Sequence, residues 1–351
     1  MKAVKILSPG RALVVTDAIP PKPSPTDLLI KVIAVALNPT DWKHIEFGIP
    51  ATVGCDFAGV VEEVGSAVTR PFKKGDRIWS AVAGSNKLRP DNGAFSEYLV
   101  VKSGLVMKIP EGASFEDAAT GGVGVMTVGQ GMYQQWEEVP WPDKPMKERV
   151  PLLIWGGSSA TGALGVQFGK LSGFEVITTC GKHNFDYVKS LGADAVFDSR
   201  SPTVGADIRA YTNDKLYYAW DCIGEHGSPD AIAAALASSK PEGQKLRHGT
   251  IMFRPGTKVH RDDATFTWSI AYTTHGEVVD TMGLKVPAKP EDYAFAVKWT
   301  EMVERLYVEG RFRMHRVEVR EGGLEGVLGG LKDMKDGNVS GVKLMYRIAD
   351  P

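Results

Sequence analysis

Apolar and polar positions follow two different patterns along this chain. Up to about residue 120 the apolar runs are short, as at residues 3–7 and 28–37, and turns rich in Gly and Pro separate them. That pattern predicts a mostly β domain. From residue 150 onward, short apolar runs alternate with segments of helical spacing, which predicts parallel strands joined by helices. The predicted fold class is therefore α/β, with a mostly β domain beside a doubly wound parallel sheet.

Two further segments extend this picture. Asn38 and Pro39 lead into a short helix, which we expect Thr40 or Asp41 to cap. Residues 134–149 are polar and interrupted by prolines, so we expect a surface excursion before the first strand of the parallel sheet.

Residues 150–182 have the pattern of a dinucleotide-binding βαβ unit. An apolar run at 152–155 leads into a turn with Gly156 and Gly162, a helical segment follows, and a second β run ends at Cys180. Glycines at such a turn let the backbone approach a pyrophosphate, and the N-terminus of the next helix attracts phosphates. Ser159 interrupts the glycine spacing, so an ordinary strand-to-helix turn is the alternative.

The end of the second β run bears on the choice between NAD and NADP. An NAD site usually has Asp or Glu there, on the ribose 2′-hydroxyl. This chain has no carboxylate between Cys180 and Asp186. It has Lys182, which can face a 2′-phosphate, and Gly181 and Asn184, which can bond to one. We predict NADPH, with a solvated loop lysine as the alternative for Lys182.

Composition excludes several other classes of protein. A chain of 351 residues is long enough for two domains with cores, and its net charge of −1 gives no reason to expect nucleic-acid or membrane binding. No apolar run approaches a membrane span, and the N-terminal segment lacks a signal-peptide core. Three cysteines form neither a disulfide framework nor a CxxC pair. We expect a cytoplasmic protein.

The order of these parts resembles the medium-chain dehydrogenase/reductase superfamily over essentially the whole chain. The motifs that carry the resemblance are Gly54-x-Asp56-x-Ala58-Gly59, Gly75-Asp76-Arg77-Ile78, Gly93-Ala94-Phe95-Ser96-Glu97-Tyr98, the turn at 156–162 and the run at 337–343. The resemblance implies a GroES-like domain of residues 1–124 and 290–351, and a Rossmann NADPH-binding domain of residues 125–289.

Zinc-binding members of this superfamily hold a catalytic zinc with an early Cys and the His of a Gly-His-Glu motif. Here those positions look like residues 38–40 and Gly54-Cys55-Asp56, so we expect no Cys, His and carboxylate at tetrahedral spacing. The chain therefore resembles a zinc-independent member, with Cys55 as a small core residue. Such members reduce activated C=C bonds.

Three segments resemble the fungal trans-acting enoyl reductases of polyketide synthases (lovastatin-pathway type): residues 38–43, 134–149 and 180–186. That resemblance implies a monomer that uses NADPH to reduce the α,β C=C bond of an enoyl thioester on an acyl carrier domain. The alternatives are a stand-alone NADPH quinone or enone reductase, and a cofactor-binding protein without activity.

The resemblance also implies the site residues. Lys43 and Thr127 are the candidate catalytic residues. An ammonium can stabilise an enolate or bind the cofactor, and a hydroxyl can donate to the thioester carbonyl. A surface lysine and a helix-interior threonine are the alternatives. The cofactor contacts implied are Thr40, Asp41, Trp42, Lys43, Ser158, Ser159, Ala160, Thr161, Gly181, Lys182, His183, Asn184, Ser199, Phe253, Arg254, Ser340 and Gly341.

An acyl pocket is expected from two segments, and the proton source is open. The residues expected to line the pocket are Val128, Gly129, Gln130, Gly131, Met132, Tyr133, Gln134, Gln135, Tyr272, Thr273, Thr274, His275 and Gly276. Water is a possible proton source, because no residue marks itself as a dedicated acid. His44 and His275 are more typical of loop or surface positions than of catalysis.

Overall fold

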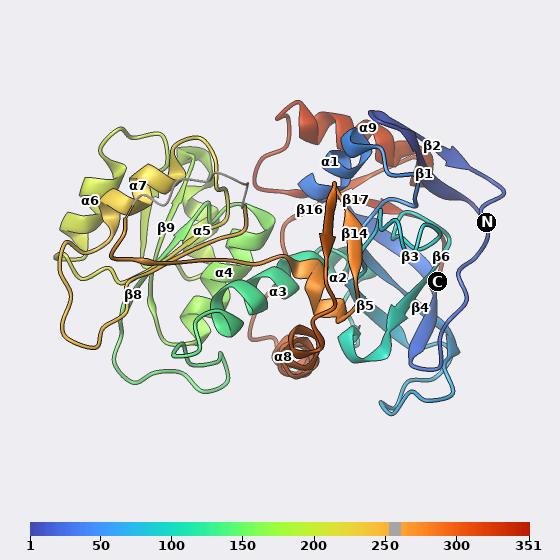
Figure 1. Ribbon diagram of the computed structural model, residues 1–351, viewed down its shortest axis with the longest axis horizontal. Coiled ribbons are helices and arrows are strands. Elements are labelled where there is room, and N and C mark those ends of the chain that lie inside the picture. The colour runs from blue at the N-terminus through green and yellow to red at the C-terminus, as the bar shows by residue number, and fades with distance from the viewer. Residues whose placement is uncertain (253–260) are drawn as a thin grey trace. The chain divides into compact units, whose positions relative to one another are not determined.

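A computed structural model describes residues 1–252 and 261–351 (Figure 1). These residues form two compact units: Met1–Met126 with Ala271–Pro351 (unit 1), and Thr127–Ile270 (unit 2). Residues 271–289, expected in the nucleotide-binding domain, belong to unit 1. Hydrogen bonds hold them there. The Lys87 N–H donates to the Asp280 carbonyl at 2.9 Å, and the Thr281 hydroxyl donates to the Ser85 carbonyl at 3.1 Å.

Unit 1 is built on a mostly antiparallel sheet in the order β16-β17-β3-β4-β5-β7, with β6 also paired to β3. The predicted β domain is confirmed. Two hairpins, β1–β2 and β14–β15, accompany the sheet. The strands are β1 (Ala3–Ser8), β2 (Arg11–Val15), β3 (Asp27–Ala36), β4 (Asp56–Val64), β5 (Arg77–Ala81), β6 (Tyr98–Lys102), β7 (Met107–Lys108), β14 (Val279–Thr281), β15 (Leu284–Val286), β16 (Val317–Arg320) and β17 (Lys343–Arg347).

The longest helix of unit 1, α8 (Pro290–Val308), buries an apolar face. In α8 that face carries Trp299, Met302 and Leu306, and the Trp299 indole N–H donates to the Val125 carbonyl at 2.9 Å. Helical spacing predicts such a stripe. The helices are α1 (Pro39–Phe47), η1 (Ser103–Leu105), α2 (Phe115–Ala118), α3 (Gly122–Val128, which runs into unit 2), η4 (Ala271–His275), α8 (Pro290–Val308) and α9 (Gly323–Lys335).

Unit 2 is an all-parallel sheet in the order β10-β9-β8-β11-β12-β13, with helices packed on it (Figure 1). In chain order this is the 3-2-1-4-5-6 arrangement of a Rossmann fold, as the sequence predicts. Its elements are η2 (Gly129–Gln134, a π-helix), β8 (Pro151–Trp155), α4 (Ala160–Leu171), β9 (Glu175–Cys180), η3 (Lys182–Asn184), α5 (Phe185–Ser190), β10 (Ala195–Asp198), α6 (Val204–Tyr211), β11 (Tyr218–Asp221), α7 (Ser228–Ala235), β12 (Arg247–Thr250) and β13 (Thr265–Trp268).

The excursion at residues 134–149 is anchored in unit 2 and is not purely a surface segment. Trp136 is fully buried and donates its indole N–H to the Thr267 hydroxyl at 3.1 Å. Arg247 donates from Nε and Nη2 to the two carboxylate oxygens of Glu138, each at 2.8 Å. Only the later part, from Asp143 onward, is mainly exposed. Across the described residues, no helix has the length and apolar character that a bilayer crossing requires.

Candidate active site

The first turn of α1 fixes the polar centre of unit 1. Asn38 is the N-cap residue, and of the two residues expected to cap this helix Asp41 takes part, as the N3 member of a capping box, whereas Thr40 does not. Asp41 stands three residues later and accepts the backbone N–H of Asn38 at 2.8 Å, as the acidic member of a capping box does. Asp41 is therefore completely buried with its carboxylate turned back to the start of the helix.

Three segments of unit 1 bring a buried polar cluster together. Asp41 and His44 lie one turn apart on α1, and Cys55 directly precedes β4. The donor atoms of these three residues all lie within 4.8 Å of one another. Tyr272, from η4, completes the cluster: its hydroxyl oxygen lies 2.5 Å from the Thr40 hydroxyl, 3.4 Å from His44 Nε2 and 4.0 Å from Cys55 Sγ.

Burial disfavours charge on every member of this cluster. It raises the pKa of Asp41 to about 7 and lowers the pKa of His44 to about 4. It also raises the pKa of the Cys55 thiol and of the Tyr272 hydroxyl well above their usual values. In each case loss of water disfavours the charged form. The thiol and the hydroxyl therefore hold their protons, and the imidazole is neutral.

The cluster corrects one expectation about zinc. Asp41, His44 and Cys55 do bring a carboxylate, a His and a Cys together, whereas the family resemblance predicts no such set. Zinc needs such donors about 2.0–2.3 Å from a common point. Here the Tyr272 hydroxyl lies against two of these donors, 3.4 Å from His44 Nε2 and 4.0 Å from Cys55 Sγ.

A buried ion pair lies beside the cluster. Lys343, on β17, bonds to the carboxylate of Asp56, to Asn38 Oδ1 at 3.0 Å and to the Thr120 carbonyl at 3.1 Å. Lys343 and Asp56 are almost completely buried. This ammonium therefore ties the start of α1 to β4, and its charge is compensated by Asp56 and not by Asp41.

The two predicted catalytic residues stand on different units. Lys43 is half-buried on α1, and its ammonium lies 5.5 Å from the centre of the Trp42 ring. Thr127 is buried near the end of α3, the helix that continues into unit 2. Their roles stay predictions. The alternative of a surface lysine on a short helix also stays open for Lys43.

The Gly-rich turn of unit 2 leads from β8 into α4, as predicted. Gly156 has φ +81, and a side chain at Gly157 would overlap Thr178. Ser159 is the N-cap of α4 and accepts the Gly162 N–H at 3.0 Å. The departure from the glycine spacing is thus a helix cap. Ser158, Ser159, Ala160 and Thr161 are partly exposed, and the first N–H groups of a helix have no partner within it. This turn fits a dinucleotide phosphate.

Lys182 lies two residues after the end of β9 and is 80% exposed, with Asp198 Oδ2 at 3.8 Å. Asp198 ends the neighbouring strand β10, so parallel pairing brings in a carboxylate that linear spacing conceals. Ser199, next to it, donates its N–H to the Cys180 carbonyl at 3.1 Å. The predicted contacts Gly181, Lys182, His183, Asn184 and Ser199 therefore gather at the carboxyl ends of adjacent strands, where ligands of such sheets bind.

The first predicted acyl-pocket segment, residues 128–135, is a helical segment with a π-helical turn. Val128, Gln130, Met132 and Tyr133 are buried. The Tyr133 hydroxyl lies 2.8 Å from the Ser172 hydroxyl, and Gly131 lies directly against the indole of Trp220. These contacts belong to the interior of unit 2. A π-helical turn is itself a common mark of a functional segment.

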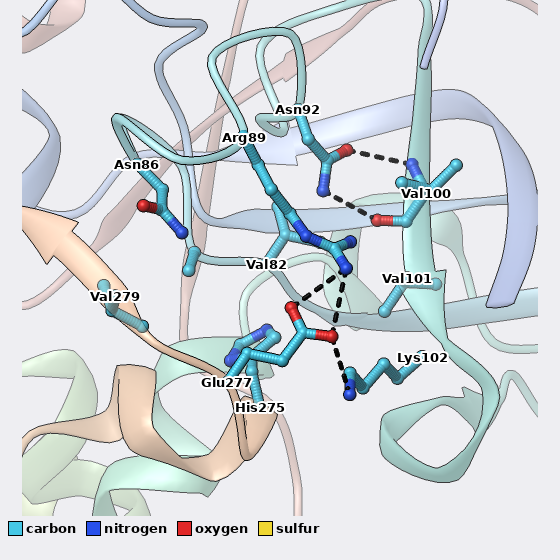
Figure 2. Close-up of a pocket in the computed structure, with 11 residues that line it drawn as sticks. Val82, Asn86, Arg89, Asn92, Val100, Val101, Lys102, His275, Glu277 and Val279 are labelled. Atoms are coloured by element: carbon cyan, nitrogen blue, oxygen red, sulfur yellow. Dashed lines mark hydrogen bonds and ion pairs between the residues drawn. The ribbon is translucent and has the colours of Figure 1, made fainter. Parts of the chain in front are cut away.

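The second predicted pocket segment, residues 272–276, forms most of η4 and its end. Tyr272, Thr273 and Thr274 are buried. His275 borders a cavity of about 20 Å³ that Arg89, Lys102 and Glu277 also line (Figure 2). Such a space holds a single water and no acyl chain. Burial lowers the pKa of His275 to about 4, so this imidazole is neutral at pH 7 and is a poor acid.

The remaining predicted contacts are dispersed. Phe253 and Arg254 lie outside the described residues. Gly341 accepts the Arg316 guanidinium at 3.0 Å through its carbonyl, and Ser340 is exposed just before it. The sequence missed that Tyr272 joins Thr40, and that Asp41, His44 and Cys55 meet. Only the i,i+3 spacing of Asp41 and His44 could have suggested part of this cluster.

Comparison with known proteins places this architecture in a family. Two family models match, "Alcohol dehydrogenase GroES-like domain" over residues 24–111 and "Zinc-binding dehydrogenase" over residues 160–268. A structure of a putative zinc-dependent alcohol dehydrogenase from Rhizobium etli is similar in fold, with a TM-score of 0.77 at 23% identity over 100% of this chain and 99% of that one. The chain thus has the two-domain fold of the medium-chain dehydrogenases and reductases.

Characterised relatives narrow the class. A trans-enoyl reductase of Aspergillus sclerotiorum is 40% identical over 99% of this chain and 100% of its own length. The trans-enoyl reductase TOXD of Cochliobolus carbonum is 44% identical over 79% of this chain and 91% of its own. The chain belongs to the family of fungal trans-enoyl reductases.

Proposed function

We propose that this chain reduces the α,β C=C bond of an enoyl thioester, carried on the acyl carrier domain of a polyketide synthase, with NADPH as reductant. The observation that carries the proposal is the similarity to trans-enoyl reductases over nearly the whole length of both chains. A Rossmann unit with a Gly-rich turn before α4, together with a GroES-like unit in the same chain, supplies a framework that fits this reaction.

The cofactor would be held mainly by unit 2. The α4 N-terminus, at Ser158 to Thr161, would take the pyrophosphate, and Lys182 the 2′-phosphate of NADPH. Asp198 lies near Lys182 and offsets part of that positive charge. The preference for NADPH over NADH therefore has to be measured. When bound, the nicotinamide supplies a hydride.

Two side chains would act on the thioester. Enolate charge develops on the carbonyl oxygen as the β-carbon is reduced, and a positioned donor stabilises it. We assign this part to the Thr127 hydroxyl and the Lys43 ammonium. We also propose that the enzyme is monomeric, cytoplasmic and free of zinc. Support for the last point is the Tyr272 hydroxyl that His44 and Cys55 face.

The test is NADPH oxidation with a short α,β-unsaturated pantetheine thioester, beside a simple quinone and with NADH as control. We expect turnover with the thioester and NADPH, and metal content of the purified protein far below one equivalent. Lys43→Ala and Thr127→Val should each lower kcat about 10²-fold, with little change in thermal unfolding. Lys22→Ala, at an exposed lysine, is the matched control.

The possible outcomes separate the functions. Turnover of the quinone alone would replace enoyl reduction by quinone reduction and remove the carrier-protein partner. Binding of NADPH without turnover of either acceptor would point to a cofactor-binding protein. Wild-type kcat in both variants would refute the roles of Lys43 and Thr127 while leaving the activity itself in place.

A further inference from the structure

One hydrogen-bonded pair joins residues that the sequence assigns to different ligands. Thr40 is predicted to contact the cofactor and Tyr272 the acyl group. The two hydroxyl oxygens, 232 positions apart in sequence, lie 2.5 Å from each other. Thr40 is half-buried, whereas Tyr272 and His44 are buried. The pair therefore runs from an accessible hydroxyl to an enclosed one.

The Tyr272 hydroxyl, the buried member of the pair, lies next to a group that can donate a hydrogen bond to it. His44 Nε2 lies 3.4 Å from the Tyr272 oxygen. A neutral imidazole with its proton on Nε2 can donate to that oxygen, and would stabilise it if the tyrosine gave up its own proton. Burial raises the pKa of Tyr272, so the hydroxyl is protonated in the resting protein.

The segment that carries Tyr272 is held in place by charged contacts. Glu277, just beyond η4, contacts Arg89 at 2.9 Å and Lys102 at 2.8 Å (Figure 2). The Thr273 hydroxyl donates to Asp292 on α8. A proton donor is effective only when its position is fixed relative to the reacting carbon. These contacts hold η4 at Thr273 and the backbone just after its end.

We propose that the Thr40–Tyr272 hydroxyl pair donates the proton that completes the reduction at the α-carbon, an inference that rests on the proposed function. The β-carbon gains a C–H bond from the hydride and its electron pair, and the C=C electrons move to the thioester enolate. The Thr40 O–H bond then breaks as the α-carbon C–H bond forms. The Tyr272 proton passes to the Thr40 oxygen, and the Tyr272 oxygen accepts the His44 N–H. After product release, water returns one proton through Thr40.

The experiment compares wild type, Tyr272→Phe and Thr40→Val in D₂O, with NADPH and the same pantetheine thioester. Two quantities are followed: kcat, and the configuration of the deuterium at the α-carbon, determined by NMR of the product. Wild type should give one configuration. Both variants should lose about 10²-fold or more in kcat, as loss of a proton donor does, and should give a mixture of configurations because water reaches either face.

Control measurements separate chemistry from structure. Tyr346→Phe removes a buried tyrosine hydroxyl from β17 in the same unit, away from the cluster, and should keep the wild-type rate and configuration. NADPH affinity and thermal unfolding show whether each variant is folded. A purely structural role for Tyr272 would lower stability without mixing the configurations, and that result would overturn the proposal.

Two other results are decisive. Wild-type kcat with a single configuration in Tyr272→Phe would also overturn the inference while leaving enoyl reduction intact. No NADPH oxidation by the wild-type protein with the thioester would refute the proposed function itself, and this inference with it. The failure of one idea is thus distinguishable from the failure of the other.

Discussion

Single buried residues decide the chemistry of unit 1, and two aspartates show how differently burial acts. Asp56 has the ammonium of Lys343 against its carboxylate. Asp41 bonds instead to the backbone N–H of Asn38. A carboxylate removed from water without a cation against it is stabilised in its protonated form. This contrast explains why the pKa of Asp41 is raised to about 7.

The raised pKa of Asp41 predicts a dependence of stability on pH. Unfolding returns this pKa to about 3.8, so between pH 4 and 7 the folded protein binds more protons than the unfolded chain. The contribution of Asp41 is therefore fully present below pH 4, falls as pH rises, and is lost above pH 7. Asp41→Asn does not titrate. Wild type should lose up to roughly 4 kcal/mol relative to this variant across that range.

Chemical denaturation of both proteins at several pH values measures this difference. A difference in the free energy of unfolding that stays constant from pH 4 to 7 would show that Asp41 is ionised in the folded protein.

At the same scale, the sequence names candidate residues but not the partners that they meet. Thr40 and Tyr272 were each predicted as site residues, but their hydrogen bond joins segments 232 positions apart. No local pattern encodes such a contact. The start of α1 shows a related limit. Asn38 and Asp41 can both cap by type, and only the backbone angles at Asn38 show that it is the N-cap and that Asp41 is the N3 member of the capping box.

At the scale of elements, the π-helix η2 contains a glycine, Gly131, whose position has no room for a side chain. A Cβ on Gly131 would lie 2.7 Å from the indole nitrogen of Trp220, which is fully buried. Gly329, on the exposed side of α9, has no atom within 4 Å of such a Cβ. The same substitution should therefore have opposite effects at the two helical positions.

Gly131→Ala should destabilise unit 2 by about 1–3 kcal/mol, because the indole has no free space into which to move. Gly329→Ala should stabilise unit 1 by up to about 1 kcal/mol, since alanine favours a helix. Thermal unfolding of the two variants measures both. Equal stabilisation by both substitutions would mean that Trp220 yields readily.

Elements with a strong local period were predicted well. The unit β8-α4-β9 was found from its apolar runs and its glycine turn, and α8 from its apolar stripe. The burial of Trp136 was not foreseen, because prolines and charges around it gave no period. Its indole reaches Thr267 on β13, 131 positions later, and only the assembled sheet supplies that partner.

At the scale of the whole chain, the last residues complete the first unit. β17 pairs with β3 and carries Lys343 to Asp56, 287 positions earlier. The superfamily resemblance predicts this return of the chain to its first domain. It did not predict the ion pair, because no spacing relates two residues so far apart.

Removing one charge of this ion pair should therefore destabilise unit 1 far more than removing both. Lys343→Met leaves the Asp56 carboxylate buried with the Val123 N–H at 2.6 Å as a partner, and should cost about 3–5 kcal/mol. Asp56→Leu with Lys343→Met removes both charges and should recover much of that loss. Lys332→Met, in an exposed pair with Asp336, should change stability by under about 0.5 kcal/mol. Calorimetry of the four proteins tests this. A single variant within about 1 kcal/mol of wild type would show that water or a neutral Asp56 replaces the lysine.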